Sequence, residues 1–191
     1  RSTLQGNSSE DLILDVDWGR DLAIDAAAQK AYWTTRNPTQ DVRRANLDGT
    51  GSEIIVPDLA SHLIQGLALD IGAGKVYWID DSALVIHRAN LDGSNAEPLV
   101  VMEDFGGESI ALDIGNGKMY WPSRVDQSTS RLRRANLDGT QVETIVTLTA
   151  RLPSKIALDL LFGKIYWKGG VGFTRSNLDG SRIEALLSAE N

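Results

Sequence analysis

The dipeptide Tyr-Trp occurs four times along this chain, at residues 32–33, 77–78, 120–121 and 166–167. The copies are 45, 43 and 46 residues apart, and they contain every tyrosine and four of the five tryptophans. Self-similarity with such a period is typical of repeat architectures, in which each repeat forms one supersecondary unit. The 191 residues therefore have room for about four units.

Two other motifs accompany every copy of the dipeptide. A small residue, an apolar residue and Asp precede it, at residues 23–25, 68–70, 111–113 and 157–159. The tetrapeptide Asn-Leu-Asp-Gly follows it, at residues 46–49, 90–93, 136–139 and 177–180. Three motifs in one order, four times over, indicate internal repeats.

Within a repeat the apolar residues alternate with a period of two, which favours short β-strands. In the second repeat we expect strands at residues 66–70, 75–79, 85–89 and 98–101. The unit predicted is therefore a four-stranded antiparallel meander.

The Asp-Gly dipeptide in each repeat predicts a two-residue hairpin turn, with both residues at positive φ, between the third and fourth strands. Counting outward from this turn places an Arg opposite a Glu in every repeat: Arg44 and Glu53, Arg88 and Glu97, Arg134 and Glu143, Arg175 and Glu184. We interpret these pairs as charges that fix the register of an exposed outer hairpin, and not as ligand-binding residues.

Four-stranded meanders that repeat every 40 to 50 residues are typical of β-propellers. Residues 66–70, 74–80 and 88–93 resemble the YWTD repeat, also called the low-density lipoprotein receptor class B repeat, and the resemblance covers about residues 19–188. We therefore predict an all-β fold, a four-bladed β-propeller with four-stranded antiparallel blades. Because neighbouring residues on a strand face opposite sides, Tyr should fill one gap between blades and Trp the other.

The predicted organisation is one propeller domain, residues 1–191, with repeats at about 19–63, 64–107, 108–153 and 154–188. Residues 9–16 echo the last outer strand, so we expect them to form a closing strand of a four-bladed ring. Propellers of the family that the sequence resembles typically have six blades, and only Asp80 retains the acidic residue of the motif. There are two alternatives to a closed four-bladed ring. The chain could exchange strands in a homodimer, or it could be an excerpt of a longer propeller.

The loops that lead into the first strand and out of the second strand of each blade share one face. Their residues differ between repeats while the strand residues recur, as expected for a constant scaffold that presents a specific surface. The candidate ligand-binding residues on this loop-rich face are Trp18, Arg20, Arg36, Gln65, Asp80, Asp81, Glu108, Arg124, Asp126 and Lys168.

Composition excludes several function classes. The net charge of −7 argues against binding to nucleic acid, and no apolar run is long enough to span a membrane. The chain has no cysteine and only two histidines, which suggest no catalytic pair, so we expect no enzyme activity and no cofactor. The repeated acids Asp25, Asp70, Asp113 and Asp159 could form a Ca²⁺ ring, but we favour turn caps and expect no metal site.

The family resemblance implies a non-enzymatic, secreted or extracellular module that binds a protein partner through the loop-rich face. The main alternative is a carbohydrate-binding lectin, for which repeated blades would offer multivalent sites. A propeller hydrolase is a third possibility, and it would need converging acids and a metal.

Overall fold

The computed structural model of the chain describes residues 19–35, 40–57, 63–149, 153, 155–168 and 172–188. This part of the chain consists of strands, turns and loops, without a helix. The strands pair into four antiparallel sheets, which we call blades one to four.

The strands of each blade follow one another in chain order. Blade one contains β1 (Leu22–Asp25), β2 (Lys30–Thr34), β3 (Val42–Asn46) and β4 (Glu53–Val56). Blade two contains β5 (Ile64–Asp70), β6 (Lys75–Asp80), β7 (Val85–Asn90) and β8 (Glu97–Val101). Blade three contains β9 (Phe105–Gly106), β10 (Ala111–Asp113), β11 (Lys118–Arg124), β12 (Ser130–Asn136) and β13 (Glu143–Leu148). Blade four contains β14 (Ile156–Asp159), β15 (Lys164–Lys168), β16 (Gly172–Asn177) and β17 (Glu184–Ser188).

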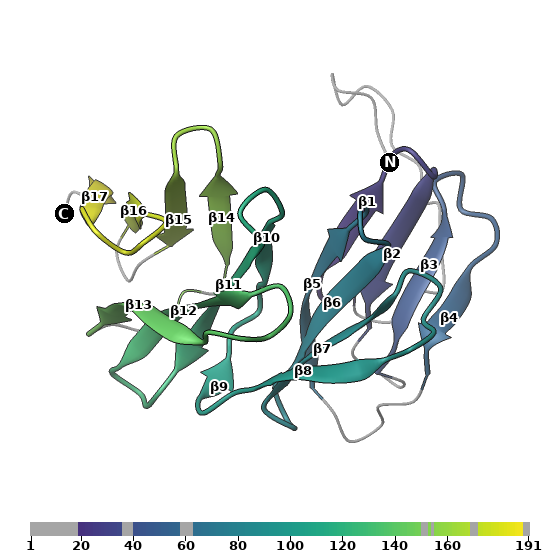
Figure 1. The fold of residues 1–191 in the computed structure, drawn as a ribbon, viewed down its shortest axis with the longest axis horizontal. Helices are drawn as coiled ribbons and strands as arrows, with labels where there is room; N and C mark the ends of the chain where they lie inside the picture. The colour runs from purple at the N-terminus through teal and green to yellow at the C-terminus, as the bar shows by residue number, and fades with distance from the viewer. Residues whose placement is uncertain are drawn as a thin grey trace.

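The first strands of the blades lie next to one another: β1 contacts β5, β5 contacts β10, and β10 contacts β14. The blades therefore radiate from these inner strands, and Figure 1 shows them in chain order with the outer strands of blades one and four at opposite ends of the molecule. The predicted all-β fold, a four-blade β-propeller with antiparallel meanders, is confirmed. The predicted closing strand at residues 9–16 lies outside the described residues and stays a prediction.

The predicted strands of the second repeat agree with β5 to β8 to within two residues at each end. The short strand β9 was not predicted. It pairs with the end of β11, where Gly106 faces Ser123 and Phe105 faces Arg124. Blade three is thus extended at its loop-rich end.

The outer hairpin differs from the predicted two-residue turn. In blade one, Asn46 accepts a hydrogen bond from Gly49 N–H and donates its own N–H to Thr50, so the loop has three residues, 47–49. Only the glycine of the Asp-Gly dipeptide has positive φ. A left-handed residue follows at position 51, 95, 141 or 182, and it restores the register. Every predicted Arg–Glu pair therefore still forms.

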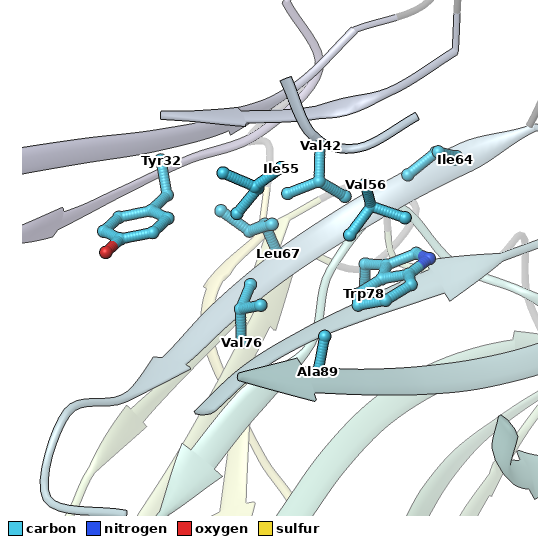
Figure 2. Close-up of a cluster of buried hydrophobic side chains, with 9 residues drawn as sticks. All are labelled: Tyr32, Val42, Ile55, Val56, Ile64, Leu67, Val76, Trp78 and Ala89. Carbon is cyan, nitrogen blue, oxygen red and sulfur yellow. The ribbon is translucent and has the colours of Figure 1, made fainter. Parts of the chain in front are cut away.

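Each of the three junctions between consecutive blades contains one Tyr and one Trp from different repeats. Tyr32 of blade one and Trp78 of blade two share a buried cluster, which Figure 2 shows with Val42, Ile55, Val56, Ile64, Leu67, Val76 and Ala89. Tyr77 and Trp121 occupy the second junction, and Tyr120 and Trp167 the third. The prediction that Tyr and Trp fill opposite gaps is confirmed, because adjacent strand residues point to opposite faces.

Backbone and side-chain contacts also join the outer parts of neighbouring blades. A Cβ on Gly93 of blade two would lie 1.8 Å from the carbonyl oxygen of Ile55 in blade one, so this hairpin turn requires glycine. Arg44 donates a hydrogen bond to the carbonyl of Leu91 in the next blade, and Arg88 and Arg134 make the same bond to Leu137 and Leu178. The arginines of the outer hairpins therefore tie blades together as well as fixing the register.

The face of blade four that points away from blade three is more exposed than the equivalent faces of the other blades. Phe173 is 50% exposed, whereas the residues at its position in blades one to three, Val42, Ile86 and Leu132, are fully buried. Among the described residues no apolar cluster joins blade four to blade one. A polar contact joins these two blades, and it belongs to the site described next.

Candidate functional site

The inner strands approach one another closely at the loop-rich end. A Cβ on Gly66 of β5 would lie 2.7 Å from Ser109 Cα and from Ile110 N, just before β10. Because no side chain fits there, the loops that lead into the four inner strands converge on a small area. Ser109 also accepts a hydrogen bond from Ile156 N–H at the start of β14.

Side chains from these converging loops form a polar network at the centre of the loop-rich face. Arg20, before β1, donates from Nη1 to Gln65 Oε1 on β5 at 3.1 Å and to Glu108 Oε1, before β10, at 3.2 Å. One guanidinium therefore bridges blades one, two and three. The three residues were predicted as site residues, and the structure brings them together.

The same network continues through two residues that were not predicted. Lys155, before β14, lies with its Nζ 2.9 Å from Asp21 Oδ1 and donates to the carbonyl of Glu108. Asp21 also accepts the N–H of Leu67 through Oδ2 at 2.9 Å. We call Arg20, Asp21, Gln65, Glu108 and Lys155 the central network, since it connects the inner strands of all four blades.

A second group lies beside the central network at the junction of blades two and three. Asp81 follows β6, is buried, and receives hydrogen bonds from the side chain of Gln65 and the backbone of Gly106. Among the described groups its Oδ1 has no hydrogen-bond partner. Burial raises the pKa of the Asp81 carboxyl, although Gln65, Gly106 and the nearby Arg124 oppose the rise in its pKa. The Asp81 carboxyl is therefore largely shielded from solvent.

An exposed aromatic residue borders the Asp81 group. Phe105 of β9 is half exposed, and the Arg124 guanidinium carbon lies 5.4 Å from the centre of its ring. This geometry is that of a cation–π contact. Phe105 and Arg124 therefore place an exposed aromatic ring and a cation together at the end of blade three.

The remaining predicted site residues occupy different positions. Asp80 is fully buried, and its Oδ1 accepts the N–H groups of Ser82 and Ala83, so it stabilises the turn after β6. Asp126 is exposed and caps the turn after β11 through Ser128 and Thr129, and these hydrogen bonds lower the pKa of its carboxyl. Lys168 is exposed at the end of β15. Trp18 and Arg36 lie outside the described residues.

Two of the site residues that the sequence analysis did not predict, Asp21 and Lys155, could have been found by aligning the four repeats. Asp21 and Lys155 occupy the same position, one residue before the inner strand, where blades two and three have Gly66 and Ser109. Opposite charges at one repeat position would meet wherever inner strands converge. For Phe105 the repeat motifs contain no such signal, because β9 lies outside them.

The repeated acids act as turn caps, as predicted. Asp25, Asp70, Asp113 and Asp159 each accept, through Oδ1, the backbone N–H three residues later. In the described residues no three acidic or histidine side chains form a group that could hold a metal ion. Nor does that part of the chain contain a helix with the length and apolarity of a membrane span.

Sequence comparison finds relatives that match less than half of this chain. No model of a known protein family matches it. Protein cueball of Drosophila willistoni is 37% identical over 89 residues, which is 44% of this chain and 13% of that protein. The human low-density lipoprotein receptor-related protein 5-like protein is 30% identical over 97 residues, 49% of this chain and 38% of that protein. The chain thus spans well under half the length of these relatives.

Structural comparison extends the likeness to nearly the whole fold. A chain in the crystal structure of the nidogen–laminin complex superposes with a TM-score of 0.81 at 23% identity, over 92% of this chain and 66% of that one. An oligogalacturonate lyase in complex with manganese superposes with a TM-score of 0.71 at 10% identity, which shows a shared fold alone. Together the repeat motifs, the blade structure and these relatives support the resemblance read from the sequence: the chain is a β-propeller whose repeats are similar to the YWTD, or low-density lipoprotein receptor class B, repeat.

Proposed function

We propose that this propeller is a non-enzymatic, extracellular module that binds a protein partner through its loop-rich face. The observation that carries the proposal is the convergence of non-repeated polar and charged residues from all four blades on that face, in the central network. A surface built from residues that differ between repeats with a common scaffold suits one specific partner. The names of the relatives, a receptor-related protein and a nidogen–laminin complex, support a role in protein recognition.

The proposed contact surface has a centre and a rim. The central network supplies charges whose positions are fixed by hydrogen bonds between blades, so little side-chain freedom is lost on binding. Phe105 and Arg124 supply an exposed aromatic residue and an arginine, the residue types enriched in the core of protein interfaces. Asp126 and Lys168 are exposed charges suited to the rim.

The test is a binding screen of the purified chain against an array of extracellular protein domains, followed by affinity measurements on each protein bound. Phe105→Ala and Arg124→Ala should each weaken binding at least tenfold. Arg182→Ala, which removes an exposed charge after the hairpin turn at the opposite end of blade four, is the matched control and should leave the affinity unchanged.

Two results would contradict the proposal. One is a protein partner whose affinity is unchanged by both loop-face variants. The other is binding to a glycan array that a simple sugar abolishes, since that result would identify a lectin.

A further inference from the structure

The turn between β14 and β15 has an unusual surface. Its first three residues, Leu160, Leu161 and Phe162, are 49%, 86% and 71% exposed. The equivalent turns contain small or polar residues at the second and third positions: Ala27 and Ala28, Gly72 and Ala73, Gly115 and Asn116. Blade four therefore presents large apolar side chains where the other blades present almost none. Consecutive exposed apolar residues of this kind mark interaction sites on soluble proteins.

This turn lies at the opposite end of the propeller from the loop-rich face, because β14 runs from that face to the turn. The exposure of Leu160 does not depend on the uncovered side of blade four. Ile71 and Ile114 hold the position of Leu160 in blades two and three, which have neighbours on both sides, and they are still 46% and 44% exposed.

The turn is held in one conformation. Asp159 Oδ1 accepts the N–H of Phe162 at 3.2 Å, and the carbonyl of Gly163 accepts the N–H of Leu178 at 3.1 Å. Gly163 has a φ of +62°, which ends the turn at a position that favours glycine. A preorganised apolar tip loses little conformational entropy when a partner covers it.

The hydrogen bond from Leu178 also places a charged turn beside the tip. Asp179 follows Leu178, is exposed, and accepts hydrogen bonds from the backbone and the hydroxyl of Ser181, which lower the pKa of its carboxyl. The cation of the apolar turn, Lys164, is half-buried and donates to Asn177. Arg134 of blade three donates to the carbonyl of Leu178, and its guanidinium is paired with Glu143. Asp179 therefore presents an exposed, ionised carboxylate beside the apolar tip.

We propose that Leu160, Leu161 and Phe162, the apolar turn surface, form a second docking site for a protein segment that carries apolar side chains flanked by Lys or Arg. The apolar residues of such a segment would cover the tip, and its cations would face Asp179. The site is separate from the loop-rich face and does not depend on the function proposed for that face.

The experiment uses three labelled peptides of equal length as probes: an amphipathic peptide of Leu and Lys, the same peptide with Glu in place of Lys, and the same peptide with Ser in place of Leu. Binding to the chain is measured by fluorescence anisotropy at low and at physiological salt. The Leu–Lys peptide should bind at least tenfold more tightly than either of the others.

The variants locate the binding site. The double substitution Leu161→Ser with Phe162→Ser should weaken binding of the Leu–Lys peptide at least tenfold. Phe173→Ser alters another half-exposed phenylalanine of blade four and should leave binding within twofold. Asp179→Asn should weaken binding and reduce its dependence on salt. Thermal melting confirms that each variant is folded. If the double variant does not fold, the single variant Leu161→Ser replaces it in the binding experiment.

Four outcomes would overturn the proposal. The double variant could bind the Leu–Lys peptide as tightly as the original chain, or the Leu–Glu peptide could bind equally well. Sedimentation could show that the chain self-associates through this turn, so that a second copy is the occupant. The chain could also bind phosphatidylcholine vesicles through Leu161 and Phe162, which would make a lipid surface the occupant.

Discussion

Lys155 and Asp21 form an ion pair between residues 134 positions apart, with 2.9 Å between Nζ and Oδ1. The pair joins blade four to blade one, and the second oxygen of Asp21 accepts the N–H of Leu67 in blade two. A single carboxylate therefore connects three blades at the loop-rich end, where β1, β5 and β14 begin.

The two members of this pair should differ in their contribution to stability. Lys155→Ala removes a half-exposed cation and should lower the free energy of unfolding by no more than about 1 kcal/mol. Asp21→Ala also leaves the partly buried N–H of Leu67 without its partner, and should cost about 1–3 kcal/mol. Urea denaturation of both variants measures the difference. Equal losses would show that the bond to Leu67 contributes nothing.

The tryptophans at the blade junctions should dominate stability. Trp78→Ala removes a fully buried ring from the first junction and should cost about 3–5 kcal/mol. Phe173→Ala, at a half-exposed position of blade four, is the matched aromatic truncation and should cost less than about 2 kcal/mol. Denaturant midpoints and slopes give both values. A loss below about 1 kcal/mol for Trp78→Ala, with the fold intact, would refute its role between blades.

Two glycines with similar backbone angles should respond differently to alanine. Gly74 has a φ of +66°, and no atom lies within 4 Å of the point that a Cβ would occupy, so Gly74→Ala should cost about 1–2 kcal/mol for the left-handed conformation. Gly93 has a φ of +83°, and its Cβ would overlap the Ile55 carbonyl of the neighbouring blade. Gly93→Ala should therefore cost clearly more, and thermal melting compares the two. Similar melting temperatures would mean that the blades separate easily.

The buried carboxyl of Asp81 should make a distinct contribution to pH dependence. Because burial raises its pKa in the folded state, the folded protein holds this proton more tightly than the unfolded chain, and ionisation at neutral pH opposes folding. Asp81→Asn should therefore gain stability relative to the original chain as the pH rises from below the unfolded pKa, near 3.8, to neutrality. Denaturation at pH 3 and pH 7 measures the change, and a relative gain at pH 3 instead would contradict it.

Much of the fold could be predicted from the sequence because it depends on local patterns that recur. Alternating apolar residues define the strands. The Tyr-Trp dipeptide places one ring on each face of the second of the four meander strands in each blade. Counting outward from the Asp-Gly dipeptide correctly predicted the Arg–Glu pairs of the outer hairpin. The turn itself was not correctly predicted, because the left-handed residue Gly51 compensates for a longer loop, and no local pattern distinguishes the two solutions.

The candidate site was predictable only in part. Arg20, Gln65 and Glu108 could be assigned to one face from strand direction, since loops at the same end of a meander share a face. Their actual contacts, and the roles of Lys155 and Phe105, depend on how closely the inner strands approach and on the short strand β9, which lies outside the repeat motifs.

The sequence by itself determined the repeat, the four-stranded unit and the residues that lie between blades, because these follow from periodicity along the chain. Only the tertiary structure decided which non-repeated residues meet. The central network joins residues from four repeats across distances that no local pattern encodes. The tertiary structure also decided which apolar residues are exposed. Leu161 and Phe162 have the composition of a core segment, yet they are exposed because their turn projects from the end of the propeller.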